Sequence, residues 1–144
     1  MSSRRSFLGA LVAAAAAGAL APGCASVVTT RVRPVNGRIL LDPAAHPGLA
    51  GAGGFVRLQP EGSSALVYLV ATGSGYAALS PICTHLGCTV EVHGARLECP
   101  CHGSTYDRGG RVLRGPAERP LHAYPVRTRP DGIIEIQLTP EGSA

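Results

Sequence analysis

Two short motifs in this 144-residue chain have the composition of a metal site. The segments Cys83-Thr-His85-Leu-Gly-Cys88 and Cys99-Pro-Cys101-His102 together hold four of the five cysteines and two of the five histidines. Soft thiolates and borderline imidazoles select zinc or iron over calcium or magnesium. The residue types therefore indicate zinc or iron and leave both open.

The distribution of the ligands separates these alternatives. A structural zinc site of the Cys2His2 kind usually takes its cysteines from one loop and its histidines from another. Here each motif supplies one Cys–His pair and one further cysteine, which suits two irons joined by sulfides, with both thiolates on one iron and both imidazoles on the other. A disulfide scaffold without metal is a third alternative, but it leaves the histidine spacing to chance.

The motifs resemble those of the Rieske iron–sulfur family, Cys-X-His-X-X-Cys followed by Cys-X-Cys-His, at every position. The resemblance implies one [2Fe–2S] cluster as the cofactor. Cys83 and Cys99 would hold one iron, and His85 and His102 the other. No separate catalytic residue is implied, because the cluster itself carries the electron.

The resemblance also implies residues that support and tune the cluster. Cys88 and Cys101 would form the disulfide that ties the cluster loops together in the high-potential branch of the family, which includes the iron–sulfur subunits of cytochrome bc complexes. Ser104 and Tyr106 stand where that branch has hydroxyls that donate to the cluster sulfurs. Imidazole ligands move the potential from around −400 mV into a range of about −150 to +300 mV, and such hydrogen bonds raise it further.

The implied function is electron transfer. A high-potential cluster of this branch accepts electrons from quinol, or from a quinol-oxidising complex with a cytochrome b-type subunit, and passes them to a cytochrome c-like acceptor. Leu86 would lie at the tip of the first loop against the quinol. Two alternatives are a free-standing periplasmic electron carrier and the Rieske small subunit of a molybdenum oxidoreductase. The chain is thus expected to be an electron-transfer protein or a subunit of an oxidoreductase complex.

Residues 1–23 are predicted to be a targeting signal, followed by a single domain over residues 24–144. Arg4 and Arg5 precede an uncharged, alanine-rich run over residues 7–21, a pattern that resembles the twin-arginine export signal. That route carries folded proteins, which suits a cluster assembled in the cytoplasm. A helix over the run would span only about 22 Å of a hydrocarbon core of about 30 Å, which favours cleavage.

Cys24 directly follows this segment. The sequence Leu20-Ala-Pro-Gly-Cys24 resembles a lipoprotein processing site, and an unpaired cysteine in an exported protein calls for an explanation. We therefore expect lipidation of Cys24 as a membrane tether, with a plain cleaved signal or a retained anchor as alternatives. The predicted location is the periplasm, in association with the membrane.

The composition excludes a nucleic-acid binder. All thirteen basic residues are arginines, the formal net charge is +4, and aromatic residues make up only 4% of the chain, so no basic stripe interleaved with aromatics is present. The arginines that follow the second motif indicate a solvated loop face more than a patch for an acidic redox partner; they are Arg108, Arg111, Arg114 and Arg119.

Short alternating or apolar runs separated by Gly and Pro predict an all-β fold. With the resemblance, this is a small antiparallel β-sandwich that carries a cluster-binding subdomain of two loops. The segment Gly115-Pro-Ala117 resembles the proline-rich loop that covers the cluster in the family. Strands are expected at residues 27–35, 38–41, 55–58, 66–71, 76–82, 89–92, 96–98, 112–113, 123–128 and 132–138.

Overall fold

The computed structural model describes residues 28–51 and 53–138. The predicted signal and Cys24 lie outside these residues. The strands are β1 Thr29–Val32, β2 Arg38–Leu41, β3 Phe55–Pro60, β4 Val67–Thr72, β5 Gly75–Leu79, β6 Glu91–His93, β7 Arg96–Glu98, β8 Thr105–Tyr106, β9 Val112–Arg114, β10 Ala123–Tyr124, β11 Val126–Thr128 and β12 Ile134–Gln137, and the short 3₁₀ helices are η1 Pro43–Ala45 and η2 Pro47–Leu49. Within the described part of the chain, no helix has the length and apolar character needed to cross a membrane.

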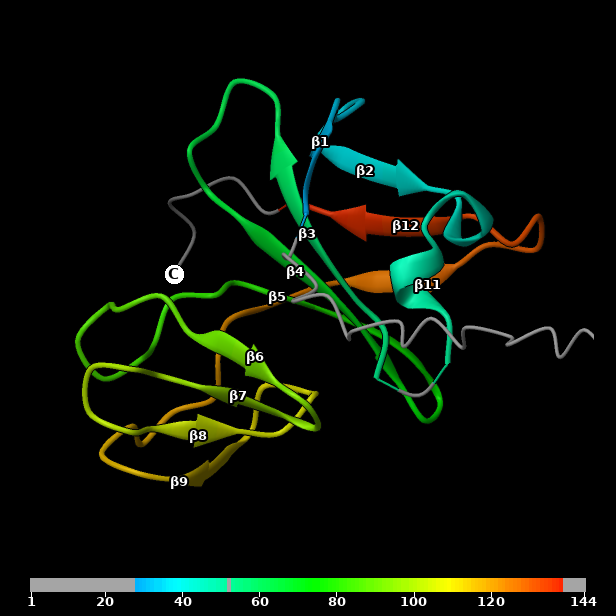
Figure 1. The fold of residues 1–144 in the computed structure, drawn as a ribbon. Coiled ribbons are helices and arrows are strands. Elements are labelled where there is room, and N and C mark those ends of the chain that lie inside the picture. Colours follow the sequence, from blue (N-terminus) through cyan, green and yellow to red (C-terminus); the bar gives the residue numbers. More distant parts are fainter. Residues whose placement is uncertain (1–27, 52, 139–144) are drawn as a thin grey trace, which may run out of the picture.

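Two sheets form a sandwich around the first hydrophobic core (Figure 1). One sheet has the strand order β1-β3-β4-β5-β10 and the other β11-β12-β2. Alternate apolar residues of β2, β3, β4 and β12 point inward, as the period of two in a half-buried strand requires. Among them, Ile39, Leu58, Leu69, Ile134 and Ile136 are fully buried.

Strand β4 is covered on both faces, and this determines where the cluster loops lie. Val67 and Leu69 belong to the first core, whereas Tyr68 and Val70 point to the opposite face and belong to a second core. This is why β4 reads as an unbroken apolar run instead of an alternating one. The second core is shared with the segment that carries the metal motifs.

That segment, residues 80–122, is an insertion between β5 and β10, two strands that pair with each other in antiparallel fashion. The N–H of Ser80 donates to the carbonyl of His122 at 2.8 Å and closes its base. Within the insertion, β6-β7-β8-β9 form a sheet of their own, the lower unit in Figure 1. The all-β prediction, a sandwich with a separate cluster-binding subdomain, is confirmed.

Three details of the strand prediction are wrong. The predicted strand 123–128 is two strands in different sheets, because Pro125 has no N–H with which to continue a ladder. The strand expected at residues 89–92 lies at Glu91–His93 instead, and its hairpin with β7 turns at Gly94-Ala95, where Gly94 takes a positive φ of 56°. Strand β1 is shorter than predicted and pairs in parallel with β3.

Glu135, a buried carboxylate on β12, is expected to make the stability of the domain depend on pH. Glu135 accepts from Nη2 of Arg127 on β11 at 3.0 and 3.1 Å and lies 3.7 Å from Arg38 on β2. The hydrogen bond from Arg127 outweighs desolvation and lowers the pKa of Glu135 below its usual 4.5. A lowered folded-state pKa adds stability above about pH 4.5 that is lost as the pH falls through the folded value.

Glu135→Gln is therefore expected to lower the urea midpoint of unfolding at pH 7. The difference from the wild type should shrink toward zero as the pH falls below 4.5. Glu61→Gln is the matched control, because its pair with Arg33 is exposed on both sides and surface pairs contribute little. If Glu135→Gln lowers the urea midpoint by the same amount at every pH, the negative charge of Glu135 is not the cause of the lost stability.

Candidate metal centre

The two motifs fold into loops with the same backbone hydrogen bonds. In the first loop, Cys83–Cys88, and the second loop, Cys99–Ser104, the N–H of the first residue donates to the carbonyl of the sixth at 2.8 Å. The N–H of the fifth residue donates back to the carbonyl of the first at 2.9 and 3.0 Å. These fifth residues, Gly87 and Gly103, have φ of 82° and 74°, a region that glycine enters without steric cost. The equal Cys-to-Gly spacing of the two motifs is the sequence signal of this equivalence, which was not among the predictions.

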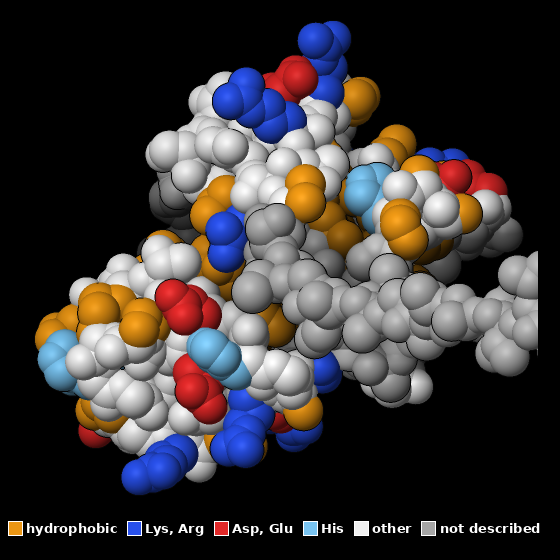
Figure 2. All heavy atoms as spheres, viewed as in Figure 1, with side chains coloured by type: hydrophobic (Ala, Val, Ile, Leu, Met, Phe, Trp, Pro, Cys, Tyr) orange, Lys and Arg blue, Asp and Glu red, His pale blue; other side chains and the backbone are white. Residues whose placement is uncertain are grey.

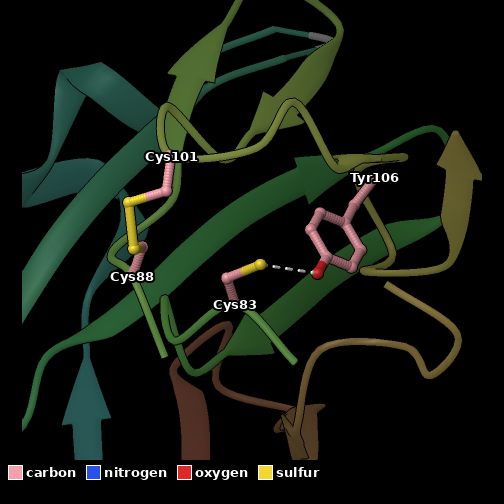
Figure 3. Close-up of a disulfide and its surroundings, with 4 residues drawn as sticks. All are labelled: Cys83, Cys88, Cys101 and Tyr106. Atoms are coloured by element: carbon pink, nitrogen blue, oxygen red, sulfur yellow. Dashed lines mark hydrogen bonds between the residues drawn. A yellow bond between two sulfur atoms is a disulfide. The ribbon is translucent and has the colours of Figure 1, made fainter. Parts of the chain in front are cut away.

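A disulfide joins the loops. Cys88 and Cys101 are bonded, with their Cα atoms 6.5 Å apart (Figure 3). The predicted pairing is confirmed. Since both sulfurs are consumed, these two cysteines are not free to bind metal.

The four predicted ligands come from the two loops that this disulfide joins, and their chemistry suits an iron–sulfur cluster. Cys83 and Cys99 are each 2% exposed and are the free cysteines among the described residues. The rings of His85 and His102 lie edge to face with centroids 4.9 Å apart. Nδ1 of His85 is buried and finds no hydrogen-bond partner in the described part of the chain. A buried nitrogen without a partner is costly, and a metal ion would satisfy it.

Tyr106 reaches Cys83 from the end of β8. Its hydroxyl lies 3.3 Å from the Cys83 Sγ (Figure 3), and it accepts from the Thr84 N–H at 3.3 Å. Burial alone would raise the pKa of the Cys83 thiol, but hydrogen bonds from Tyr106, the His85 N–H, Cys99 and Ser104 outweigh it and the net shift is downward. The surroundings thus stabilise a thiolate, which is the form that binds metal.

Ser104, in the second loop, is the other residue predicted to tune the cluster. It is fully buried, and its Oγ accepts from the Ala117 N–H at 3.1 Å. Because this bond uses a lone pair, the hydroxyl proton remains available, and Ser104 makes the smallest of the contributions that lower the pKa of Cys83. Both predicted tuning residues therefore contribute to the lowered pKa of Cys83.

The predicted cover, residues 115–117, and the residues that follow it to residue 120 are hydrogen-bonded to both loops. Ala117 is tied to the second loop through Ser104. The Thr84 hydroxyl, in the first loop, donates to the Arg119 carbonyl at 2.6 Å. Thr84 was not among the predicted site residues. Ala117, in the middle of this segment, is only 4% exposed.

Gly115, in the cover, packs closely against the backbone of Ser104. A Cβ at this position would lie 2.5 Å from the Ser104 Cα, and its φ of 102° is strained for any other residue. We expect Gly115→Ala to destabilise the domain by about 2 kcal/mol or more, by strain and overlap together, and to speed loss of bound iron. Gly132→Ala is the control, because φ is 83° there but no atom lies within 4 Å of the added Cβ. Equal midpoints of thermal unfolding for the two variants would contradict the contact.

The exposed end of the site combines histidine with apolar side chains. His102 is exposed and Leu86 is 69% exposed. Figure 2 shows hydrophobic side chains beside a histidine at the left end of the lower unit, where the loops lie in Figure 1. The predicted tip position of Leu86 agrees with this exposure.

The remaining charged candidates have ordinary roles or exposed positions. Arg111 pairs with Asp107, and Arg108 donates to the carbonyl of Gly94. His93 lies 3.3 Å from a Glu91 carboxylate oxygen. Two further histidines interact locally: His46 with the Asp42 carbonyl, and His122 with the ring of Tyr124.

Comparison with known proteins agrees with this site. Residues 48–125, more than half of the chain, match the Rieske [2Fe-2S] domain family. The chain is a Rieske protein. It is 38% identical over 101 residues to the cytochrome b6-f complex iron-sulfur subunit of Synechococcus sp. strain CC9605, covering 61% of this chain and 57% of that protein. It is 35% identical to subunit 2 of Trichormus variabilis, covering 88% of this chain and 78% of the relative.

A solved structure gives the same result. The plasma membrane Rieske protein PetC3 of Synechocystis PCC 6803 is 33% identical, with a TM-score of 0.51 over 58% of this chain and 86% of that protein. A Rieske domain holds one [2Fe–2S] cluster, and when bound it supplies one-electron redox chemistry. This Rieske domain is therefore an electron-transfer unit.

Proposed function

We propose that Cys83 and Cys99 hold one iron of the cluster and that His85 and His102 hold the other. The two imidazoles face each other with centroids 4.9 Å apart, and the two free thiols are buried in the equivalent loops that carry them. The partnerless Nδ1 of His85 supports its role as a ligand. With Nδ1 directed inward, the imidazole leaves Nε2 to interact with a partner.

The proposed donor is quinol, reached directly or within a quinol-oxidising complex. The observation that carries this proposal is the hydroxyl of Tyr106 at 3.3 Å from the Cys83 sulfur. A donated hydrogen bond favours the more negative, reduced state and raises the potential. Ser104 adds to this, and the disulfide holds the two loops in register. These are properties of an electron acceptor whose reduction potential is higher than that of a quinol.

The proposed partners follow from the same branch of the family. The Synechococcus and Trichormus relatives are subunits of cytochrome b6-f complexes. We propose a cytochrome b-type subunit as the donor-side partner and a cytochrome c-like acceptor. We also propose export by the twin-arginine route to the periplasm, with a membrane tether at Cys24. The signal and Cys24 lie outside the residues that the structure describes.

Quinol reduction of the oxidised full-chain protein tests this function. Under anaerobic conditions, a short-chain quinol is expected to reduce the cluster. The reduction is monitored through the visible absorbance of the cluster. Leu86→Asp should slow this by about tenfold or more, because burying a leucine side chain contributes about 1.5–3 kcal/mol. Leu40→Asp, an exposed leucine on β2, should not slow it. Reduction by dithionite but not by quinol would overturn the proposal.

A further inference from the structure

Three sulfur atoms lie together at the junction of the two loops. The Sγ atoms of Cys88, Cys99 and Cys101 are all within 4.8 Å of one another. Two of them are bonded to each other, so the trio is a disulfide with a free, buried thiol beside it. Cys83, the other free cysteine, is not part of this group, and its sulfur points toward Tyr106 in Figure 3.

A thiolate next to a disulfide can exchange with it. We propose that Cys99 is an internal nucleophile for the Cys88–Cys101 disulfide in protein that has lost its cluster. The Cys99 Sγ forms a bond to the Cys88 Sγ, the Cys88–Cys101 bond breaks, and Cys101 leaves as a thiolate. One disulfide and one thiolate are present before and after, so the step needs no oxidant or reductant.

Attack on Cys88 is favoured over attack on Cys101. Cys99 and Cys101 are separated only by Pro100, whose ring fixes φ near −65° and limits the adjustment that a bond across it would need. Cys99 and Cys88 belong to different loops that already face each other. Because Cys99 is 2% exposed, external thiols and oxidants reach it poorly, whereas the neighbouring disulfide is within the same packed site.

The exchange removes a ligand. This step rests on the proposed function, in which Cys99 binds iron. A Cys88–Cys99 bond leaves Cys83 as the one free cysteine ligand, and iron cannot be reloaded until the Cys101 thiolate attacks Cys88 and restores the Cys99 thiol. Iron bound to Cys99 would block the exchange. The exchange therefore competes with cluster loading, and loading before the disulfide closes, in a reducing compartment, avoids that competition.

Two variants that each lack one cysteine ligand test the exchange. Among the described residues, the free thiol begins on Cys99 in Cys83→Ser and on Cys83 in Cys99→Ser. Each full-length protein is oxidised, incubated, quenched with acid and labelled with N-ethylmaleimide in denaturant, and the labelled cysteine is located by peptide mass spectrometry. Label is expected to shift from Cys99 to Cys101 in Cys83→Ser and to stay on Cys83 in Cys99→Ser.

The wild-type protein provides a second measurement that does not depend on the folding of a variant. Purified with its cluster, it should carry no label on any cysteine ligand or disulfide partner before denaturation; after iron is removed by a chelator, Cys101 should become labelled with time. The proposal is overturned if the label stays on Cys99 in both the Cys83→Ser variant and the iron-depleted wild type. It is also overturned if the label in Cys99→Ser moves from Cys83 to Cys101 to the same extent. Failure of quinol reduction would leave this result untouched, whereas labelling of Cys99 in the loaded protein would contradict its role as a ligand.

Discussion

Replacing His85 or His102 with serine is expected to abolish the cluster. Each imidazole supplies a donor that a short hydroxyl cannot place at the same point, and the two rings lie together at the loop ends with centroids 4.9 Å apart. The buried Nδ1 of His85 has no other partner in the described chain. Iron and acid-labile sulfide in the purified variants should fall to background, and the visible absorbance of the cluster should disappear.

His93→Ser and His122→Ser are the matched controls. Both histidines are exposed and interact only locally, with Glu91 and with the ring of Tyr124. These variants should keep the iron and sulfide content of the wild type. A His85→Ser or His102→Ser protein that retains its iron and its spectrum would contradict the assignment of the ligands.

Tyr106→Phe is expected to lower the reduction potential by about 60 mV or more. The substitution removes the hydroxyl that lies 3.3 Å from the Cys83 sulfur and leaves the buried ring. A hydrogen bond to a charged group is worth about 1.5–3 kcal/mol, and about 1.4 kcal/mol corresponds to 59 mV for one electron. Redox titration followed by the optical spectrum measures the shift.

Tyr68→Phe separates this effect from general destabilisation. Tyr68 is fully buried in the same core, and its hydroxyl donates to the Val90 carbonyl at 3.0 Å instead of to a sulfur. We expect Tyr68→Phe to lower the free energy of unfolding by about 1 kcal/mol without moving the potential. Equal shifts of potential in the two variants would mean that packing, and not the hydrogen bond to sulfur, sets the tuning.

The chemistry of the site could be predicted from the sequence because it is encoded over short distances. The loops are six residues long, and the types and spacing of Cys83, His85, Cys99 and His102 specify thiolate and imidazole donors in any fold that brings the loops together. The disulfide partner of Cys88 followed only from the family resemblance, since spacing alone does not select a pairing.

Features decided by long-range packing could not be predicted in the same way. The bond from Thr84 to the Arg119 carbonyl joins residues 35 apart in sequence and depends on how the cover folds back. The Asn36-Gly37 turn predicts a hairpin of β1 with β2, and a single bridge from Val35 to Arg38 does form. Beyond it the strands enter different sheets, because β2 packs Ile39 and Leu41 into the core while β1 extends the sheet beside β3.

The reduction potential of the purified full-chain protein, with an electron paramagnetic resonance spectrum of the reduced form, is the most direct test of a high-potential centre with two cysteine and two histidine ligands. The predicted result is a potential above zero, within the range of about −150 to +300 mV of histidine-ligated clusters, and the spectrum of a reduced [2Fe–2S] centre. A potential near −400 mV, as all-cysteine clusters show, or a silent protein that contains zinc, would contradict it.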